Sequence, residues 1–273
     1  MNEQKRLEIP QTFAGSRGSG RTVGGYRLLA LDMDGTLLGK GGVLSGRTEH
    51  AIQQAIQAGV HVVLATGRRV TDVVGTAERL QPHMPLVINN GSEVWRKAGE
   101  LHVRNVIDGQ LIERLCDHVF QLDKQIEFWA HTVEGRILKA NFPQRFGDVQ
   151  WLQFAFKSQD NALLQHIWQS VEAWNVFEIS NSNEVNIEFN AFGINKASGV
   201  REIGKLLGIE MSEVIAMGDS FNDISMIRAA GLGVAMGNAQ QAVKEAADEI
   251  APRNDEDGVA AIIEKYLLGR SHN

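Results

Sequence analysis

The chain has 273 residues, of which 43% are hydrophobic and 22% are charged, and its net charge is -6 at pH 7. This composition is close to the average of soluble globular proteins, and the length fits one large or two ordinary domains. No apolar run approaches the roughly 18 residues that indicate a membrane span, and the acidic balance argues against a nucleic-acid-binding protein with a broadly basic surface. We therefore expect neither a membrane nor a nucleic acid as partner. An anionic substrate would need positive charge supplied locally.

The single cysteine, Cys116, indicates the compartment in which the protein works. One cysteine cannot form an internal disulfide, which fits a reducing environment, and its place in an apolar helical pattern predicts a buried structural thiol. Residues 1–24 are polar and rich in Gly, Ser and Arg, without the apolar stretch of a signal peptide. They favour a flexible leader, and we expect a cytoplasmic protein.

The apolar run at residues 28–38, LLALDMDGTLL, contains two aspartates one residue apart and breaks at Gly35. A short apolar run bounded by a turn predicts a buried strand, whose side chains alternate between its faces. Asp32 and Asp34 therefore share one face at the carboxyl end of the strand, where open α/β sheets bind ligands. Two carboxylates crowded there repel unless a cation or proton lies between them, and Mg²⁺ fits because it prefers few carboxylates with water and phosphate. The alternative is a solvated turn.

Strands and helices then alternate along the chain. Residues 45–59 predict a helix that begins after Ser45 and stops at Gly59. Residues 60–69 predict a strand, 69–80 a helix, and 85–94 a strand and turn. This alternation is typical of βαβ units and a parallel sheet, so Thr66 and Asn89 should lie at the same edge as Asp32.

The pattern changes between about residue 93 and residue 188. Four of the five tryptophans lie between residues 129 and 174, and the stretches KQIEFWAHTVEGRILKA and EVNIEFN alternate as antiparallel strands with one wet face do. Helical patterns around 111–120 and 162–174 interleave with them. We interpret residues 92–190 as an inserted α+β domain.

The strand and helix alternation resumes after the insertion. Helices are predicted at 196–208, 222–231, 238–247 and 257–268, and strands at 212–220 and 232–237. The α/β domain is therefore expected to be discontinuous, with residues 25–91 and 191–273 on either side of the insertion.

Four motifs occur in a fixed order along the chain: DMDGT at 32–36, ATGR at 65–68, Lys196 at the start of a helix, and GDSFNDISM at 218–226. Together they resemble the haloacid dehalogenase superfamily of phosphatases. The later AMGNA and EDGVAAII resemble its Cof-like branch. The resemblance implies a Rossmann-like parallel-sheet core with an inserted α+β cap of the C2B type. The cap falls at residues 92–190, the range that the change of sequence pattern already indicates for the insertion.

The resemblance also implies roles for individual residues. Asp32 is the expected nucleophile, and Asp34 the expected general acid and base. Mg²⁺ is expected on the carboxylates of Asp32 and Asp219 and the backbone carbonyl of Asp34. The residues expected to bind the substrate and its phosphate are Gly35, Thr66, Gly67, Lys196 and Asn222. Asp223 is expected to support them.

Taken singly, several of these residues have simpler interpretations. Thr66 could be a capping hydroxyl, Lys196 a solvated helix start, and Asp223 an acid favoured by a helix dipole. Only their joint order favours a site. In the insertion, the polar and aromatic candidates for substrate specificity are Trp129, His131, Arg136 and Arg145.

The function expected from these residues is a Mg²⁺-dependent phosphatase that hydrolyses a small phosphorylated metabolite, such as a sugar phosphate or phosphorylated cofactor, through an aspartyl-phosphate. A phosphotransferase or phosphomutase using the same intermediate is the alternative. A further alternative is a non-catalytic module that senses phosphate and switches a partner. We expect a monomer or a homodimer.

Overall fold

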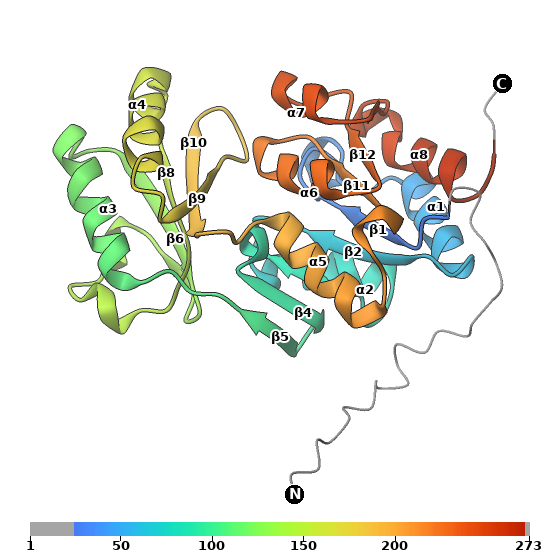
Figure 1. The fold of residues 1–273 in the computed structure, drawn as a ribbon, viewed down its shortest axis with the longest axis horizontal. Helices are drawn as coiled ribbons and strands as arrows, with labels where there is room; N and C mark the ends of the chain where they lie inside the picture. Colours follow the sequence, from blue (N-terminus) through green and yellow to red (C-terminus); the bar gives the residue numbers. More distant parts are fainter. Residues whose placement is uncertain (1–24, 271–273) are drawn as a thin grey trace, which may run out of the picture.

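The computed structural model describes residues 25–270, so the leader predicted at 1–24 and the last three residues lie outside the described residues. Within 25–270 the strands form one sheet of eight strands and one of five. Figure 1 shows the larger sheet on one side of the molecule and the smaller sheet, with α3 (Gly109–Leu122) and α4 (Asn161–Glu172), on the other. Among these residues, every helix lacks the length and hydrophobicity that a membrane span requires.

Six neighbouring strands of the larger sheet are parallel, as the alternation of strands and helices predicts. A hairpin continues the sheet antiparallel to its neighbour. In spatial order the strands are β13 (Glu249–Ile250), β12 (Leu232–Ala235), β11 (Val214–Gly218), β1 (Leu28–Leu31), β2 (His61–Ala65), β3 (Leu86–Ile88), β4 (Glu93–Lys97) and β5 (Glu100–Arg104). The residues after β11, β1 and β2 consequently meet at one edge.

Helices cover the larger sheet, and their ends follow local chemistry. The hydroxyl of Ser45 accepts a hydrogen bond from the backbone N–H of Thr48 and starts α1 (Gly46–Gln57). Gly208, with φ of 64°, ends α5 (Lys196–Leu207) in the left-handed conformation. The remaining α-helices of the larger sheet are α2 (Val74–Leu80), α6 (Ile224–Ala229), α7 (Gln241–Ala246) and α8 (Gly258–Tyr266).

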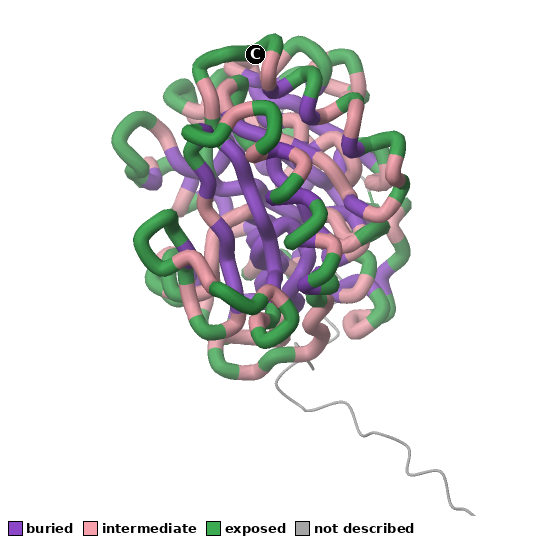
Figure 2. Tube along the Cα trace, turned by 90° about the vertical axis from the view of Figure 1, so that its left-hand side faces the viewer, coloured by how far each residue is buried: buried purple, intermediate pink, exposed green. Residues whose placement is uncertain are grey.

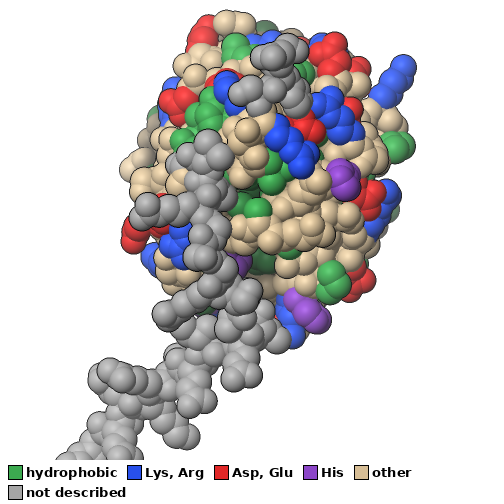
Figure 3. Space-filling view, turned by 90° about the vertical axis from the view of Figure 1, so that its right-hand side faces the viewer, with side chains coloured by type: hydrophobic (Ala, Val, Ile, Leu, Met, Phe, Trp, Pro, Cys, Tyr) green, Lys and Arg blue, Asp and Glu red, His purple; other side chains and the backbone are tan. Residues whose placement is uncertain are grey.

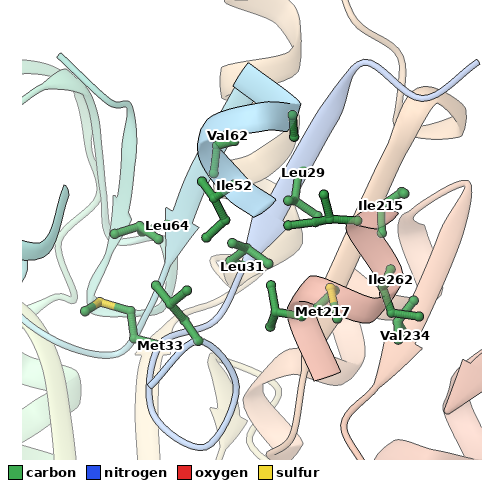
Figure 4. Packing of buried hydrophobic residues seen from close by; sticks show 14 of the residues in the cluster. Leu29, Leu31, Met33, Ile52, Val62, Leu64, Ile215, Met217, Val234 and Ile262 are labelled. Carbon is green, nitrogen blue, oxygen red and sulfur yellow. The ribbon is translucent and has the colours of Figure 1, made fainter. Parts of the chain in front are cut away.

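Alternate residues of β1 pack into two separate hydrophobic clusters, one on each face of the larger sheet. Leu29 and Leu31 pack with Ile52 of α1 (Figure 4). Leu28 belongs to the other cluster, with Val200 of α5. A strand buried on both faces cannot shift without disturbing both clusters, so the aspartates that follow it are held in place.

The smaller sheet is antiparallel throughout, which confirms the strand type predicted for the insertion. Three of its strands lie in the two predicted alternating stretches, and the predicted helices are α3 and α4. Its spatial order is β7 (Arg136–Ile137), β6 (Glu127–Thr132), β8 (Trp151–Lys157), β10 (Asn186–Ala191) and β9 (Phe177–Ser180). Cys116 of α3 is buried in the apolar cluster of this region, and burial raises the pKa of its thiol. The prediction of a structural thiol agrees with both observations.

The strand register gives the smaller sheet one apolar and one polar face. Phe128 pairs with Phe156 on the face packed with residues of α3 and α4. On the opposite face His131 pairs with Gln153. Glu188 pairs with Ala155, which lies two residues after Gln153 in β8, so Glu188 is on this face too. These three polar side chains are nonetheless buried. Figure 2 likewise shows buried strands at the centre of the molecule, with exposed turns around them.

The chain enters and leaves the smaller sheet at neighbouring points that meet at Ser92. The backbone N–H of Asn105 donates to the carbonyl of Ser92 at 2.7 Å, and Nδ2 of Asn190 donates to the Ser92 hydroxyl at 3.0 Å. Gly91, with φ of 102°, packs so closely on the backbone of Asn195 that a Cβ there would collide with it. The two chain crossings are therefore in contact.

The hairpin of β4 and β5 lies inside the range 92–190 predicted for the cap, yet its hydrogen bonds continue the larger sheet. The reason is visible in the register, since Val94 pairs with Val87 of β3. By sheet membership the larger sheet therefore reaches Arg104. The division of the chain into domains stays a prediction.

Acidic and basic side chains are mixed on the face of the molecule near the C-terminus (Figure 3). Ion pairs of this kind include Arg47 with Glu264 and Lys265 with Glu249, each at 2.8 Å. Exposed pairs contribute little to stability, typically about 0–1 kcal/mol each. On the described part of this face no broad surface of one sign is seen.

Candidate active site

A cavity of about 270 Å³ lies between the carboxyl edge of the larger sheet and the polar face of the smaller one. Both sheets contribute to its walls, so neither could form it alone. The residues that line it are Asp32, Asp34, Thr66, Gly67, Arg68 and Asp72 from the first part of the chain, Trp129, His131, Arg136, Gln153, Ser182 and Glu188 from the insertion, and Ser220 and Asn222 after β11.

Lys196 lies beneath this cavity and joins two carboxylates. Its ammonium is fully buried and donates from Nζ to Asp32 Oδ1 at 2.7 Å and to Asp223 Oδ1 at 2.6 Å. Burial opposes the charge, but the carboxylates of Asp223 and Asp32 outweigh it and raise the pKa of Lys196. The interpretation of Lys196 as a solvated helix start is therefore wrong.

Asp32, Asp219 and Asp223 form an acidic cluster in which each residue offers one oxygen within 4.8 Å of the others. Burial raises the pKa of Asp32 well above its usual value, with the carboxylates of Asp223 and Asp219 adding to the effect against Lys196. Burial, followed by Asp223, raises the pKa of Asp219 to about 7. Three carboxylates around one ammonium leave an excess of buried negative charge. The donor set consists of hard oxygens and fits a divalent cation.

Asp223 and Gly35 hold this cluster in shape. Both oxygens of Asp223 are in use, because Oδ1 accepts from Lys196 and Oδ2 accepts from the backbone N–H groups of Asp219 at 2.9 Å and Ser220 at 3.0 Å. Gly35, with φ of 82°, lies against the Asp219 carboxylate, with which a Cβ would collide. The structure places Gly35 beside an acidic residue rather than among the described residues that line the cavity.

Asp34 lies at the mouth of the cavity, with its side chain 61% exposed. Arg68 grips it with two parallel hydrogen bonds, from Nε to Oδ2 at 2.7 Å and from Nη2 to Oδ1 at 2.5 Å. Such a bidentate pair fixes the plane of the carboxylate as well as its position. Asp32 and Asp34 both line the cavity, as the alternation along the strand predicts.

Thr66 and Asn222 complete the floor of the cavity. The Thr66 hydroxyl accepts from the backbone N–H of Arg68 at 3.2 Å, so the residue does cap its loop, but its own hydrogen stays available to a ligand. Asn222 donates from Nδ2 to Asn90 Oδ1 at 3.1 Å. Its Oδ1 is buried and has no hydrogen-bond partner among the residues that the structure describes.

Three of the four specificity candidates from the insertion, Trp129, His131 and Arg136, do line the cavity, and Arg145 is not among the described lining residues. His131 contacts Asn89 Oδ1 through Nδ1 at 2.8 Å. Burial, together with the positive charges of Arg69 and Arg136, lowers the pKa of His131 to about 4. The imidazole is therefore neutral at pH 7.

Several lining residues were not predicted from the sequence. Arg68 stands in the ATGR motif beside Thr66, so its position was a usable signal. Glu188 belongs to the alternating stretch EVNIEFN, but alternation alone does not say which polar residue faces a ligand. The others that were missed are Asp72, Gln153, Ser182 and Ser220.

The sequence pattern of one family, described as haloacid dehalogenase-like hydrolase, matches residues 29–166 and 148–263. The chain belongs to this family. The resemblance drawn from the four motifs is thereby confirmed, and so is the predicted fold class of an α/β core with a cap. As a member of a hydrolase family with this site, the protein is an enzyme.

The chain is similar to proteins named as phosphatases over most of its length. It is 41% identical over 242 residues to the 5-amino-6-(5-phospho-D-ribitylamino)uracil phosphatase YcsE of Bacillus subtilis, covering 89% of this chain and 96% of the relative. It is 29% identical to the pyridoxal phosphate phosphatase YbhA of Escherichia coli, covering 89% and 99%. Among solved structures, a haloacid dehalogenase-like hydrolase from B. subtilis superposes with a TM-score of 0.79 at 25% identity, covering 87% and 99%.

Proposed function

We propose that the protein is a Mg²⁺-dependent phosphatase that hydrolyses small phosphomonoesters through a phosphorylated Asp32. The observation that carries the proposal is the buried Asp32 carboxylate, held at the cavity by Lys196 within an acidic cluster. Phosphoryl transfer needs an oxygen nucleophile in line and charge neutralisation around the phosphoryl group. The cluster supplies the oxygen nucleophile. Its excess negative charge favours a bound cation, which would neutralise the charge of the phosphoryl group.

In the first step an oxygen of Asp32 attacks phosphorus, and the bond from phosphorus to the ester oxygen breaks. Lys196 holds Oδ1 of Asp32 and so fixes the carboxylate for attack. Asp34, in its protonated form, gives its proton to the departing alkoxide, which leaves as an alcohol. Because Arg68 grips Asp34 in this structure, Arg68 must release it and can then reach the phosphoryl oxygens.

In the second step water attacks the aspartyl-phosphate. Asp34 takes a proton from this water, the bond between the Asp32 oxygen and phosphorus breaks, and inorganic phosphate leaves. Thr66 donates its hydroxyl hydrogen to a phosphoryl oxygen during both steps. The residues that would hold Mg²⁺ are Asp32, Asp219 and, through its backbone carbonyl, Asp34, and the ion would supply positive charge for the phosphoryl oxygens.

The substrate class follows from the cavity and from the relatives. A cavity of about 270 Å³ with amide, hydroxyl and aromatic side chains suits a small polar leaving group. Two relatives are named for phosphorylated metabolites with a heterocyclic ring. We place 5-amino-6-(5-phospho-D-ribitylamino)uracil first among the substrates to test, because the relative named for it shares 41% identity.

The experiment that tests the proposal measures phosphate release from a panel that includes this compound, pyridoxal phosphate, sugar phosphates and p-nitrophenyl phosphate. We expect release in Mg²⁺ and none after chelation. The absence of release from every member in Mg²⁺ would refute the proposal. Transfer of the phosphoryl group to an added sugar would favour the phosphotransferase, and a phospho-Asp32 stable for hours would favour the sensor. Location and oligomeric state stay predictions.

A further inference from the structure

Asn90 is the point where the two halves of the active site touch. It belongs to the turn η4 (Asn89–Gly91) after β3, and its backbone N–H donates to the carbonyl of Thr66 at 3.0 Å. Its side chain donates from Nδ2 to Glu188 Oε2 of the insertion at 2.7 Å and accepts at Oδ1 from Asn222. One amide thus connects a strand of the smaller sheet to the loop after β11.

The direction of these hydrogen bonds is fixed by chemistry. A carboxylate only accepts hydrogen bonds, so Asn90 must turn its NH₂ group towards Glu188. The carbonyl oxygen of Asn90 then faces Asn222, so Asn222 must donate a hydrogen bond from its own NH₂ group. The oxygen of Asn222 is left on the other side, buried and without a partner among the described residues.

Glu188 is itself held so that it cannot turn away. Oε2 accepts a second hydrogen bond from Gln153 Nε2 at 3.0 Å, and Oε1 accepts from Ser182 Oγ at 2.5 Å and Asn186 Nδ2 at 3.0 Å. All of these partners are neutral donors. Glu188 therefore acts as the fixed end of a chain of three side chains that runs from the cap to the floor of the cavity.

Asn90 is equally constrained on the side of the larger sheet. It adopts φ of 55° and ψ of 28°, the left-handed conformation that asparagine tolerates better than most residues. Its Oδ1 lies 3.1 Å from the position of a Cβ on Gly67, so the absence of a side chain there gives the amide its place. The only other acceptor described for Nδ2 of Asn90 is Asn190 Oδ1 at 3.4 Å, which lies on the same strand as Glu188, so the Asn90 amide follows the position of this strand.

We propose that Glu188 sets the orientation of the Asn222 amide through Asn90, so that the phosphate-binding face of the cavity is correctly arranged only when the cap is docked. Asn90 and Glu188 are then positioning residues. The proposal rests on the proposed function, because it assigns Asn222 to the phosphate-binding side of the phosphatase site. Its consequence is that the polarity of the Asn90 to Glu188 contact matters more than the identity of either residue.

A reciprocal exchange of the two residues tests this polarity. In Asn90→Asp two carboxylates face each other, and we expect kcat/KM to fall by about 100-fold through like-charge repulsion. In Glu188→Gln the new amide can still accept through its carbonyl but no longer carries the charge, and we expect a smaller loss of about 10-fold. In the double variant Gln at 188 donates to Asp at 90, which still accepts from Asn222, so kcat/KM should recover to within about 10-fold of the wild type.

The matched control is Glu127→Gln, which removes the same charge from the same sheet at a side chain that is 74% exposed. It should leave kcat/KM unchanged. Thermal unfolding of all variants separates loss of fold from loss of orientation, since a merely structural role would not give recovery on exchange. If Asn90→Asp does not fold, the comparison of Glu188→Gln with Glu127→Gln decides, and equal activities overturn the proposal.

The outcomes separate this proposal from the one on which it rests. A wild-type protein that releases no phosphate from any ester of the panel refutes the phosphatase. An active wild type whose folded double variant is no better than Asn90→Asp refutes the positioning role alone, as does a folded Asn90→Asp with wild-type kcat/KM. Recovery in the double variant, with normal activity of Glu127→Gln, supports it.

Discussion

The two sheets place their functional side chains in different ways. The larger sheet is buried on both faces, so its polar residues lie where strands end, as Asp32 does after β1 and Asp219 after β11. The smaller sheet packs one face under helices and turns the middle of its strands, with His131 and Glu188, towards the cavity. Parallel sheets offer an edge and antiparallel sheets offer a face. We propose that the edge carries the chemistry and that the face carries substrate recognition.

The largest effect is expected from a substitution that removes the nucleophile at the edge of the larger sheet and leaves the smaller sheet unchanged. Asp32→Asn keeps the shape of the side chain but removes the oxygen nucleophile, so we expect kcat to fall by at least about 10⁴-fold. Phosphate release in single-turnover and steady-state assays measures the loss. The circular dichroism spectrum should match that of the wild type. A folded variant with wild-type turnover would disprove the assignment of Asp32.

Removal of the metal should act on the edge as well. After exhaustive chelation we expect no measurable turnover and full recovery with Mg²⁺, because three clustered carboxylates require a compensating cation. Added Mg²⁺ should also raise the melting temperature of the chelated protein, since it binds the folded state. Activity that survives chelation, confirmed by elemental analysis, would contradict the prediction.

The apolar face of the smaller sheet can be tested by its contribution to stability. Phe154 is fully buried on this face and stacks on Phe128 with ring centroids 5.7 Å apart. Phe154→Ala should lower the free energy of unfolding by about 3–5 kcal/mol. Denaturant unfolding measures it, and the exposed Phe192→Ala, which leaves no buried cavity, is the control. Equal losses in the two variants would contradict the burial of this face.

The smallest expected effect concerns the polar face and pH. His131 has a folded-state pKa of about 4 against about 6.5 when unfolded, so the unfolded chain binds more protons between these values. The neutral His131 side chain contributes its full stabilisation above about pH 6.5. As pH falls towards 4 this contribution is lost, which lowers the free energy of unfolding by at most about 3 kcal/mol. His131→Asn should lose less stability than the wild type between pH 7 and pH 5. Parallel pH profiles for the two proteins would exclude this role.

The sequence revealed the edge of the larger sheet better than the face of the smaller one. Asp32, Asp34 and Asp219 could be predicted, because strand alternation and the order of the motifs place them at one edge. Lys196 was expected only from the resemblance, since no local pattern indicates that a lysine at a helix start will be fully buried between two carboxylates.

What the sequence did not reveal depends on contacts distant along the chain. The grip of Arg68 on Asp34 joins residues 34 positions apart, and the contact of Asn90 with Glu188 joins residues 98 apart. Both require the docked position of two segments, which no local period encodes. Strand β8 (Trp151–Lys157) was missed for another reason: almost every residue is buried, so it does not alternate clearly. Gly35 lies against Asp219, a contact that the sequence did not indicate, and its expected role at the phosphate stays a prediction.

The meeting of both chain crossings at Ser92 has a consequence for how such proteins diversify. Asn105 and Asn190 bond to the same residue, so the 84 or so positions between them start and finish at nearly one point. A segment with adjacent ends can be replaced by another of different length at little entropic cost, because closing the gap requires almost no extra chain. Recombination could therefore exchange this whole segment for another while the acidic edge of the recipient protein remains intact.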